Sequence, residues 1–298
     1  GFRYTYYIVN GDQSGGAGAG DYAEIQYKLE AQDMATSGWN YTSASSYITL
    51  SFWVKSSVGQ NFYGFVYSAD GTAQRYIFQT GNITANSWNK VVVTIPGGSN
   101  VAFDDNVEEG LIIKWIPFYG TDLTNNSGTT LNTWANYNGG ARTPDNTSTW
   151  YTTNNSTFWL TGVQLEVGSQ ATPFEHRSFA DELQRCQRYY YRQNATTNQF
   201  FRGMGMADVD GNSIELNSPF PVTMRVAPTS IEQTGTANNY KIRRSTTATC
   251  TSVPSFGHAT RDQLQCRFTK SGHGFGDGSA VRCVSGSDAA FIAVDAEL

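Results

Sequence analysis

The chain has 298 residues, which is enough for two modest domains or one large one. It carries 20 Lys and Arg against 25 Asp and Glu, and 14% of its residues are aromatic. This aromatic content excludes a disordered chain, and the low charge with abundant Tyr, Thr, Asn and Gly is typical of an all-β protein with polar loops.

The charge is unevenly distributed along the chain. Residues 1–175 hold 7 Lys and Arg and 14 Asp and Glu, whereas residues 176–298 hold 13 and 11. An acidic first part argues against nucleic acid as a partner, because that affinity comes mostly from neutralising phosphates. No apolar run approaches the roughly 20 residues that a membrane span needs. The abrupt strand-like start without an initiator Met suggests that upstream residues are missing.

The first part of the chain alternates with the two-residue period of half-buried strands. The clearest strand is "YITLSFWVKSS", 47–57, in which alternate residues face opposite sides. One predicted side holds Ile48, Leu50, Phe52 and Val54, and the other holds Thr49, Ser51, Trp53 and Lys55. Further strands are predicted in "YAEIQYKLEA", "NFYGFVYSA", "QRYIFQT", "NKVVVTIPG", "GLIIKWIPFYG" and "TFWLTGVQLEVG". Strands at these intervals favour a β-sandwich over residues 1–175.

One connection in this part, residues 120–157, is unusually long for a structureless loop in a compact domain.

A short amphipathic helix is predicted over about 179–191, within a connector at 176–192. Ser178 followed by Asp181 resembles a capping box. One apolar stripe runs through Phe179, Leu183, Cys186 and Tyr190. So short a helix is unstable alone, so the stripe must pack either on the sandwich or on copies of itself.

After this helix the strand pattern returns, which predicts a smaller β domain over 193–298. Its clearest feature is a hairpin that turns at Asp210 and Gly211. The four cysteines, Cys186, Cys250, Cys266 and Cys283, show no C-x-x-C spacing, which argues against zinc. Free thiols are expected, with Cys186 buried in the helix and a Cys250–Cys266 disulfide as the alternative.

Catalytic motifs are absent, so we predict that the protein is not an enzyme. The three histidines, His176, His258 and His273, have no Gly-x-Ser-x-Gly or His-Glu-x-x-His partner. The acids at Asp104, Asp105, Glu108 and Glu109 could supply the two carboxylates of a glycosidase, but they read more simply as a solvated loop.

Calcium is the one cofactor that the sequence suggests. Asp12, Asp21 and Glu24 flank the glycine-rich loop 11–21, and Ca²⁺ prefers several oxygen ligands supplied by such turns. The alternative is that these acids simply face solvent, and the absence of a tight D-x-D-x-D spacing favours it.

Carbohydrate binding is the chemistry that the residues support best, since aromatic rings stack on the C–H faces of sugars. Six aromatic residues lie in polar segments where they are expected to be exposed: Trp39, Tyr41, Trp134, Tyr137, Trp150 and Tyr151. Packing of their loops onto the sandwich is an equal alternative. Four other tryptophans lie in or beside strand patterns and are expected in the core: Trp53, Trp88, Trp115 and Trp159.

Several of these segments resemble a family of bacteriophage virion proteins, the tail-fibre and related structural proteins of marine and cyanobacterial phages. The likeness is carried by "ITLSFWVKSS", "SWNKVVVTIPG", "FWLTGVQLEVGSQATPFEHRSFADELQRCQRYY" and the terminal "AAFIAVDAEL". It covers about 22–190 and the last strand.

The resemblance implies a jelly roll similar to carbohydrate-binding modules, then a short helix and a distal β domain, usually assembled as a homotrimer in a virion. It supplies no sugar-contact residues. The leading hypothesis is a non-enzymatic tail-fibre or receptor-binding protein that attaches to a host-surface glycan. The alternatives are a purely architectural virion protein and a polysaccharide-degrading enzyme.

Overall fold

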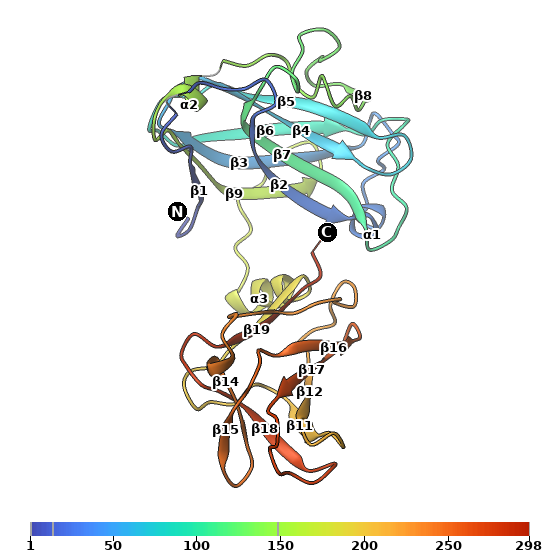
Figure 1. Ribbon diagram of the computed structural model, residues 1–298. Helices are drawn as coiled ribbons and strands as arrows, with labels where there is room; N and C mark the ends of the chain where they lie inside the picture. Colours follow the sequence, from blue (N-terminus) through green and yellow to red (C-terminus); the bar gives the residue numbers. More distant parts are fainter. Residues whose placement is uncertain (1, 14, 148, 298) are drawn as a thin grey trace. The chain divides into compact units, whose positions relative to one another are not determined.

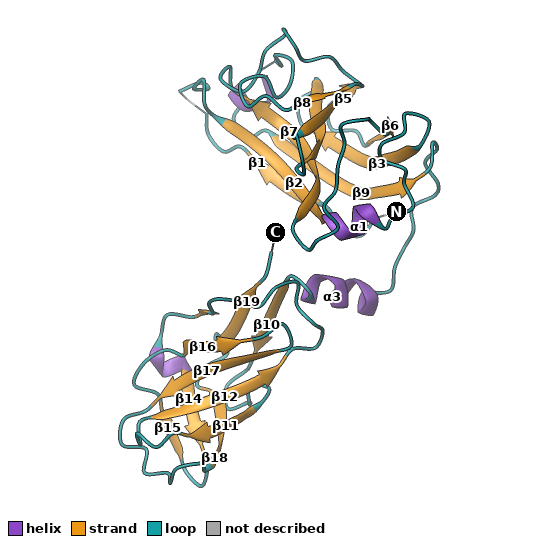
Figure 2. Ribbon diagram, turned by 90° about the vertical axis from the view of Figure 1, so that its right-hand side faces the viewer, coloured by secondary structure: helices purple, strands orange, loops and turns teal. Residues whose placement is uncertain are grey.

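A computed structural model describes residues 2–13, 15–147 and 149–297. The chain divides into two compact units, Gly1–His176 and Arg177–Leu298, each built almost entirely of antiparallel strands (Figures 1 and 2). The prediction of an all-β fold with few helices is confirmed, and the predicted connector helix belongs to unit 2. Within the described residues, no helix is long and apolar enough to cross a membrane.

Unit 1 is a sandwich of two sheets. The four-stranded sheet has the order β1 (Tyr6–Val9), β9 (Thr157–Val167), β3 (Tyr47–Ser56) and β6 (Asn89–Pro96). The five-stranded sheet has the order β2 (Tyr22–Glu30), β7 (Glu109–Tyr119), β4 (Asn61–Ser68), β5 (Gln74–Asn82) and β8 (Trp134–Asn136). The chain crosses between the sheets after β1, β2, β3, β5, β6 and β8, which is the connectivity of a jelly roll. Two short helices, α1 (Ala31–Ala35) and α2 (Thr149–Thr152), lie in its loops.

The core of unit 1 lies between the two sheets and follows the predicted alternation. Ile48, Leu50, Phe52 and Val54 of β3 are buried there. Trp115 of β7 is buried as well, as predicted. Burial of one face of each strand forces the alternate side chains onto the outer faces of the sandwich.

Residues 120–157 are not structureless, because they contain β8 and α2 and pack against the sandwich. Leu123, Leu131 and Tyr137 cover a small apolar cluster on the outer face of the five-stranded sheet, formed around Phe65 and Ile77. The segment therefore closes part of that face and leaves the rest open.

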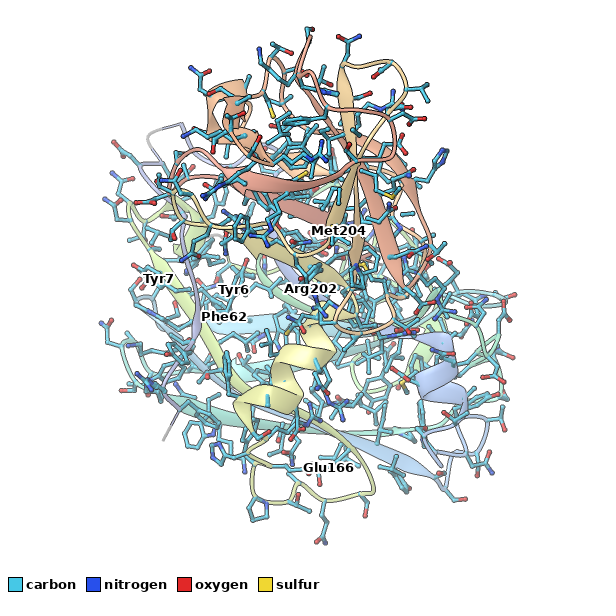
Figure 3. The ribbon with its side chains drawn as sticks, turned by 90° about the horizontal axis from the view of Figure 1, so that it is seen from below. Tyr6, Tyr7, Phe62, Glu166, Arg202 and Met204 are labelled. Atoms are coloured by element: carbon cyan, nitrogen blue, oxygen red, sulfur yellow. The ribbon has the colours of Figure 1, made fainter. Side chains whose placement is uncertain are left out.

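The segment that follows β9 folds back onto the strand it has just left. Gln164 accepts a hydrogen bond from the backbone N–H of Glu175 (2.8 Å), and Glu166 accepts one from the N–H of Thr172 (3.1 Å). Glu166 lies near the end of β9, far along the strand from the Tyr7 pairing (Figure 3). These contacts give "GVQLEVGSQATPFEH" an architectural role, since its polar residues anchor the chain where it leaves the sandwich.

Unit 2 also has two antiparallel sheets. The seven-stranded sheet has the order β15 (Thr247–Thr249), β14 (Tyr240–Arg243), β18 (Ala280–Ser285), β11 (Met204–Ala207), β12 (Ser213–Pro219), β17 (Gln263–Thr269) and β16 (Ser255–Ala259). The three-stranded sheet has the order β10 (Tyr190–Asn194), β19 (Phe291–Asp295) and β13 (Glu232–Gln233). Helix α3 (Phe179–Gln187) and the 3₁₀ turn η1 (Ala237–Asn239) complete the unit.

The hairpin predicted at Asp210 and Gly211 joins β11 to β12, and Gly211 has a φ of +65°. Cys250, Cys266 and Cys283 are free thiols in the core of unit 2. Burial raises the pKa of Cys250 and of Cys266 to about 12, so both stay protonated and unreactive.

We expect the Gln164→Ala variant to raise the pKa of Glu166 toward its ordinary value of 4.5. The hydrogen bonds from Gln164 and Thr172 hold that pKa low, because they favour the ionised carboxylate. Stability from a lowered pKa is present above the ordinary value and is lost as the pH falls through the lowered one. An NMR titration of the Glu166 carboxyl carbon measures this, and an unchanged pKa in the variant would contradict it.

Candidate functional site

The predicted sugar-binding aromatics do not form one exposed cluster. Trp39 and Trp150 are 3% and 1% exposed, so the expectation that they face solvent is wrong. Their indole N–H groups donate to the backbone carbonyls of Ser46 (3.2 Å) and Thr157 (3.0 Å). Both residues belong to the core because their polar-looking segments pack onto the sandwich.

Three others are half-buried and packed. The ring of Tyr41 lies edge-on to that of Phe103, with centroids 4.8 Å apart. Trp134 donates its N–H to the carbonyl of Pro96 (2.7 Å). Tyr151 packs against the core and donates its hydroxyl to Asp21 (3.0 Å). Tyr137 is the member of the set that borders an open sheet surface.

That surface, which we call the five-strand face, is the open part of the outer side of the five-stranded sheet. It consists of Tyr22, Glu24, Gln26, Lys28, Tyr67, Glu109, Lys114 and Tyr137. The ring of Tyr137 contacts that of Tyr67 edge-on at 4.8 Å between centroids. Tyr22 is 61% exposed at the other end of the surface, so aromatic rings border it on two sides.

An ionic network occupies the middle of the five-strand face. Lys114 donates to Glu24 (2.8 Å), and both side chains are only about 15% exposed. Glu24 also accepts a hydrogen bond from the hydroxyl of Tyr119. Burial, together with this bond to the carboxylate, raises the pKa of Tyr119, which stays a neutral donor. Lys28 and Glu109 form a second ion pair beside the network.

Chemically, the five-strand face combines apolar rings with fixed donors and acceptors. This is the usual composition of a site for a polar, neutral ligand. Sequence reasoning assigned Tyr137 to a binding role but missed Tyr67 and Lys114, because the strand pattern alone does not show which loops leave a sheet open.

The acids predicted as calcium ligands do not come together as one group of ligands. Asp21 accepts hydrogen bonds from Tyr151 and from the N–H of Gly18 (2.8 Å), and Glu24 is neutralised by Lys114. Asp12 is exposed. Across the part of the chain that the structure describes, no three acidic, His or Cys side chains gather as metal ligands do.

The predicted helical stripe is shorter than expected. Ser178 caps α3 by accepting from the N–H of Asp181, as predicted, but the helix ends at Gln187. Tyr190 is instead the first residue of β10 and pairs with Asp295 of β19. Tyrosine favours strands, and this pairing partner lies far away in the sequence.

The remaining stripe is open. Phe179 is 81% exposed, Leu183 is 42% exposed, and Cys186 is exposed rather than buried as predicted. The polar side of the helix faces Val222 and Thr223 across a hollow of about 350 Å³.

Of the four tryptophans expected in the core, one is buried and three are not. Trp115 is buried, but Trp53 and Trp159 are half-buried and Trp88 is 40% exposed, all on the outer side of the four-stranded sheet. The outward position of Trp53 could have been predicted from the alternation of its strand, which places this residue and Phe52 on different sides of the sheet.

Comparisons with known proteins give little guidance. No family model and no curated protein matches the chain. One similar solved structure is described as "Family 16 Carbohydrate Binding Module-2", with 11% sequence identity and a TM-score of 0.26. The match covers 55% of this chain and 77% of that one. A likeness this distant carries no argument, so the jelly-roll assignment depends on strand order alone.

We expect Glu24→Gln to lower the free energy of unfolding by about 2 kcal/mol, because it leaves the Lys114 ammonium largely buried without its counter-charge. The matched control is Glu109→Gln, whose more exposed pair with Lys28 is expected to contribute less than about 1 kcal/mol. Urea denaturation measures both variants. Equal losses in the two variants would show that the Glu24 pair is not the buried centre of the surface.

Proposed function

We propose that the protein is a non-enzymatic binding protein that attaches to a glycan through the five-strand face. The observation that carries this proposal is the ring pair Tyr67 and Tyr137 beside the Glu24–Lys114 network. Tyrosine rings cover the apolar C–H faces of a sugar, while a fixed ion pair offers both donors and acceptors to its hydroxyls.

The carboxylates of this surface support binding rather than catalysis. Glycoside hydrolysis needs one carboxylic acid that releases a proton and a second carboxylate that acts on the sugar or on water. Glu24 is committed to Lys114 and Tyr119, and Glu109 is committed to Lys28. Both side chains therefore act as fixed acceptors in this proposal.

We also propose a virion role, at the surface of a bacteriophage tail or capsid. The resemblance of the strand and junction segments to tail-fibre proteins supports it. A glycan site on such a protein would serve attachment to the host surface. The second candidate is an architectural virion protein, and the open apolar side of α3 favours it.

Assembly as a homotrimer is part of this proposal. Large exposed apolar side chains mark contact sites, and Phe179 and Leu183 stand on one side of α3. Three copies of the helix that pack these residues around a shared axis would bury them as a short coiled coil does.

Binding is tested on an array of neutral bacterial-surface glycans with the full chain. We expect Tyr67→Ala and Tyr137→Ala to weaken the bound signal about tenfold, because the rings are the central apolar contact. Tyr22→Ala removes an exposed ring of the same face, so a change in its binding would not result from a disturbed fold.

The control is Tyr4→Ala, which removes a ring that is 77% exposed away from this face. A folded protein that binds no glycan on the array would contradict the binding role and leave the architectural candidate. Release of reducing ends from a bound polysaccharide would instead establish an enzyme.

Assembly is tested by sedimentation equilibrium. We expect the wild-type chain to be a trimer and Leu183→Asp to dissociate it, because a charge would replace a buried apolar contact. Gln184→Asp, on the polar side of the same helix, is expected to remain trimeric. A monomeric or dimeric wild-type protein, or an unchanged Leu183→Asp variant, would rule out the helix as the trimer contact.

A further inference from the structure

The outer side of the four-stranded sheet carries a row of aromatic and cationic side chains, which we call the four-strand face. It consists of Tyr7, Trp53, Lys55, Trp88, Lys90 and Trp159. Tyr7 projects from β1, where Figure 3 labels it, and pairs with Trp159 of β9. Trp159 in turn pairs with Lys55 of β3, so the row crosses three adjacent strands, and Trp88 extends it beside β6.

The side chains of this row contact one another through ring stacking and cation–π interactions. Tyr7 and Trp159 are stacked, with centroids 5.1 Å apart and planes 27° apart. The ammonium of Lys55 lies 4.1 Å from the ring centroid of Trp159 and 5.3 Å from that of Trp88. These contacts stabilise the sheet, and they use the ring faces of Tyr7 and Trp159 that a ligand would otherwise stack on.

The indole N–H groups of this face find no acceptor in the part of the chain that the structure describes. Trp39, Trp134 and Trp150 each donate to a backbone carbonyl. Among the described residues, no such bond is found for the three tryptophans of the four-strand face, which are Trp53, Trp88 and Trp159. These donors are thus available to a bound molecule.

The two lysines of this face also form no ion pair with any described residue. Elsewhere in unit 1, Lys28 and Lys114 are ion-paired, and Arg75 is buried. Within the described ranges, neither Lys55 nor Lys90 has a carboxylate within 4.0 Å.

Two carboxylates lie on the same side of the sheet: Glu166 accepts bonds from Gln164 and Thr172, and Glu175 belongs to the segment whose backbone donates to Gln164. Glu166 is near enough to Lys90 for that charge to help lower its pKa, after the hydrogen bonds from Gln164 and Thr172. The row itself therefore presents donors and positive charge, and the acidic side chains lie at the far end of β9.

We propose that the four-strand face binds an acidic polysaccharide, whose carboxylate or sulfate groups are held by Lys55, Lys90 and the indole N–H groups. A neutral sugar fits less well, because the ring faces of Tyr7 and Trp159 on which it would stack are taken by each other and by Lys55. Nucleic acid also fits less well, because its densely spaced phosphates require many cations and this face offers two lysines, Lys55 and Lys90. This second site lies on the opposite outer side of the sandwich from the proposed glycan site.

The test measures binding of the full chain to polygalacturonate, dextran sulfate and neutral dextran by affinity electrophoresis at low salt. We expect retardation by the two acidic polymers, little by neutral dextran, and weaker binding as salt rises. Lys55→Gln and Lys90→Gln are each expected to weaken binding about tenfold, as the loss of a hydrogen bond to a charged group would. Trp88→Phe keeps a ring but removes the N–H, and is also expected to weaken binding.

The matched control is Lys241→Gln, which makes the same change of charge on β14 in unit 2. Equal weakening in this control, absence of binding to both acidic polymers, or tighter binding to single-stranded DNA would overturn the proposal. Lys90 is exposed, so its variant keeps the test valid if Lys55→Gln disturbs the sheet. Tyr67→Ala is expected to bind the acidic polymers normally, which separates this site from the five-strand face.

Discussion

The two-residue period of β3 is the constraint on which the arrangement of unit 1 depends. This strand pairs with β6 on one side and β9 on the other, so a slip by one residue would break two ladders at once. Its register buries Leu50 and Phe52 completely, and the same register turns Trp53 and Lys55 outward. The register of β3 thus determines both which residues form the core and which residues form the exposed cationic surface.

Local patterns in the sequence were enough to predict the long strands of the sandwich, the β11–β12 hairpin and the cap of α3, but they did not show the short strand β8. They failed where a distant contact decides the outcome. Tyr190 continues the helical spacing of Phe179 and Leu183, but it pairs with Asp295 as part of β10. Trp150 lies in a polar segment and yet is buried, because a hydrogen bond to Thr157 and the core of the sandwich hold it.

The candidate surfaces illustrate the same limit. Glu24 and Lys114 are 90 residues apart, so no local spacing predicts their ion pair. Tyr137 was predicted from its polar surroundings, but its partner Tyr67 lies on a strand whose outer face is half covered by a loop. The alternation of β3 correctly placed Trp53 on the outer side, whereas its hydrophobic side chain led to the wrong prediction that it lies in the core. On an outer sheet face, the period of the strand is therefore the better guide than the residue type.

Unit 2 opens with β10 and closes with β19, and these two strands lie side by side with Tyr190 opposite Asp295. Arg225 donates to the carbonyls of Ala296 and Glu297, which holds this closing segment in place. The first and last strands of the unit are therefore neighbours within the three-stranded sheet. A module of this kind can be replaced by another of different shape without rerouting the chain around it, so variation in unit 2 is separable from the construction of the jelly roll.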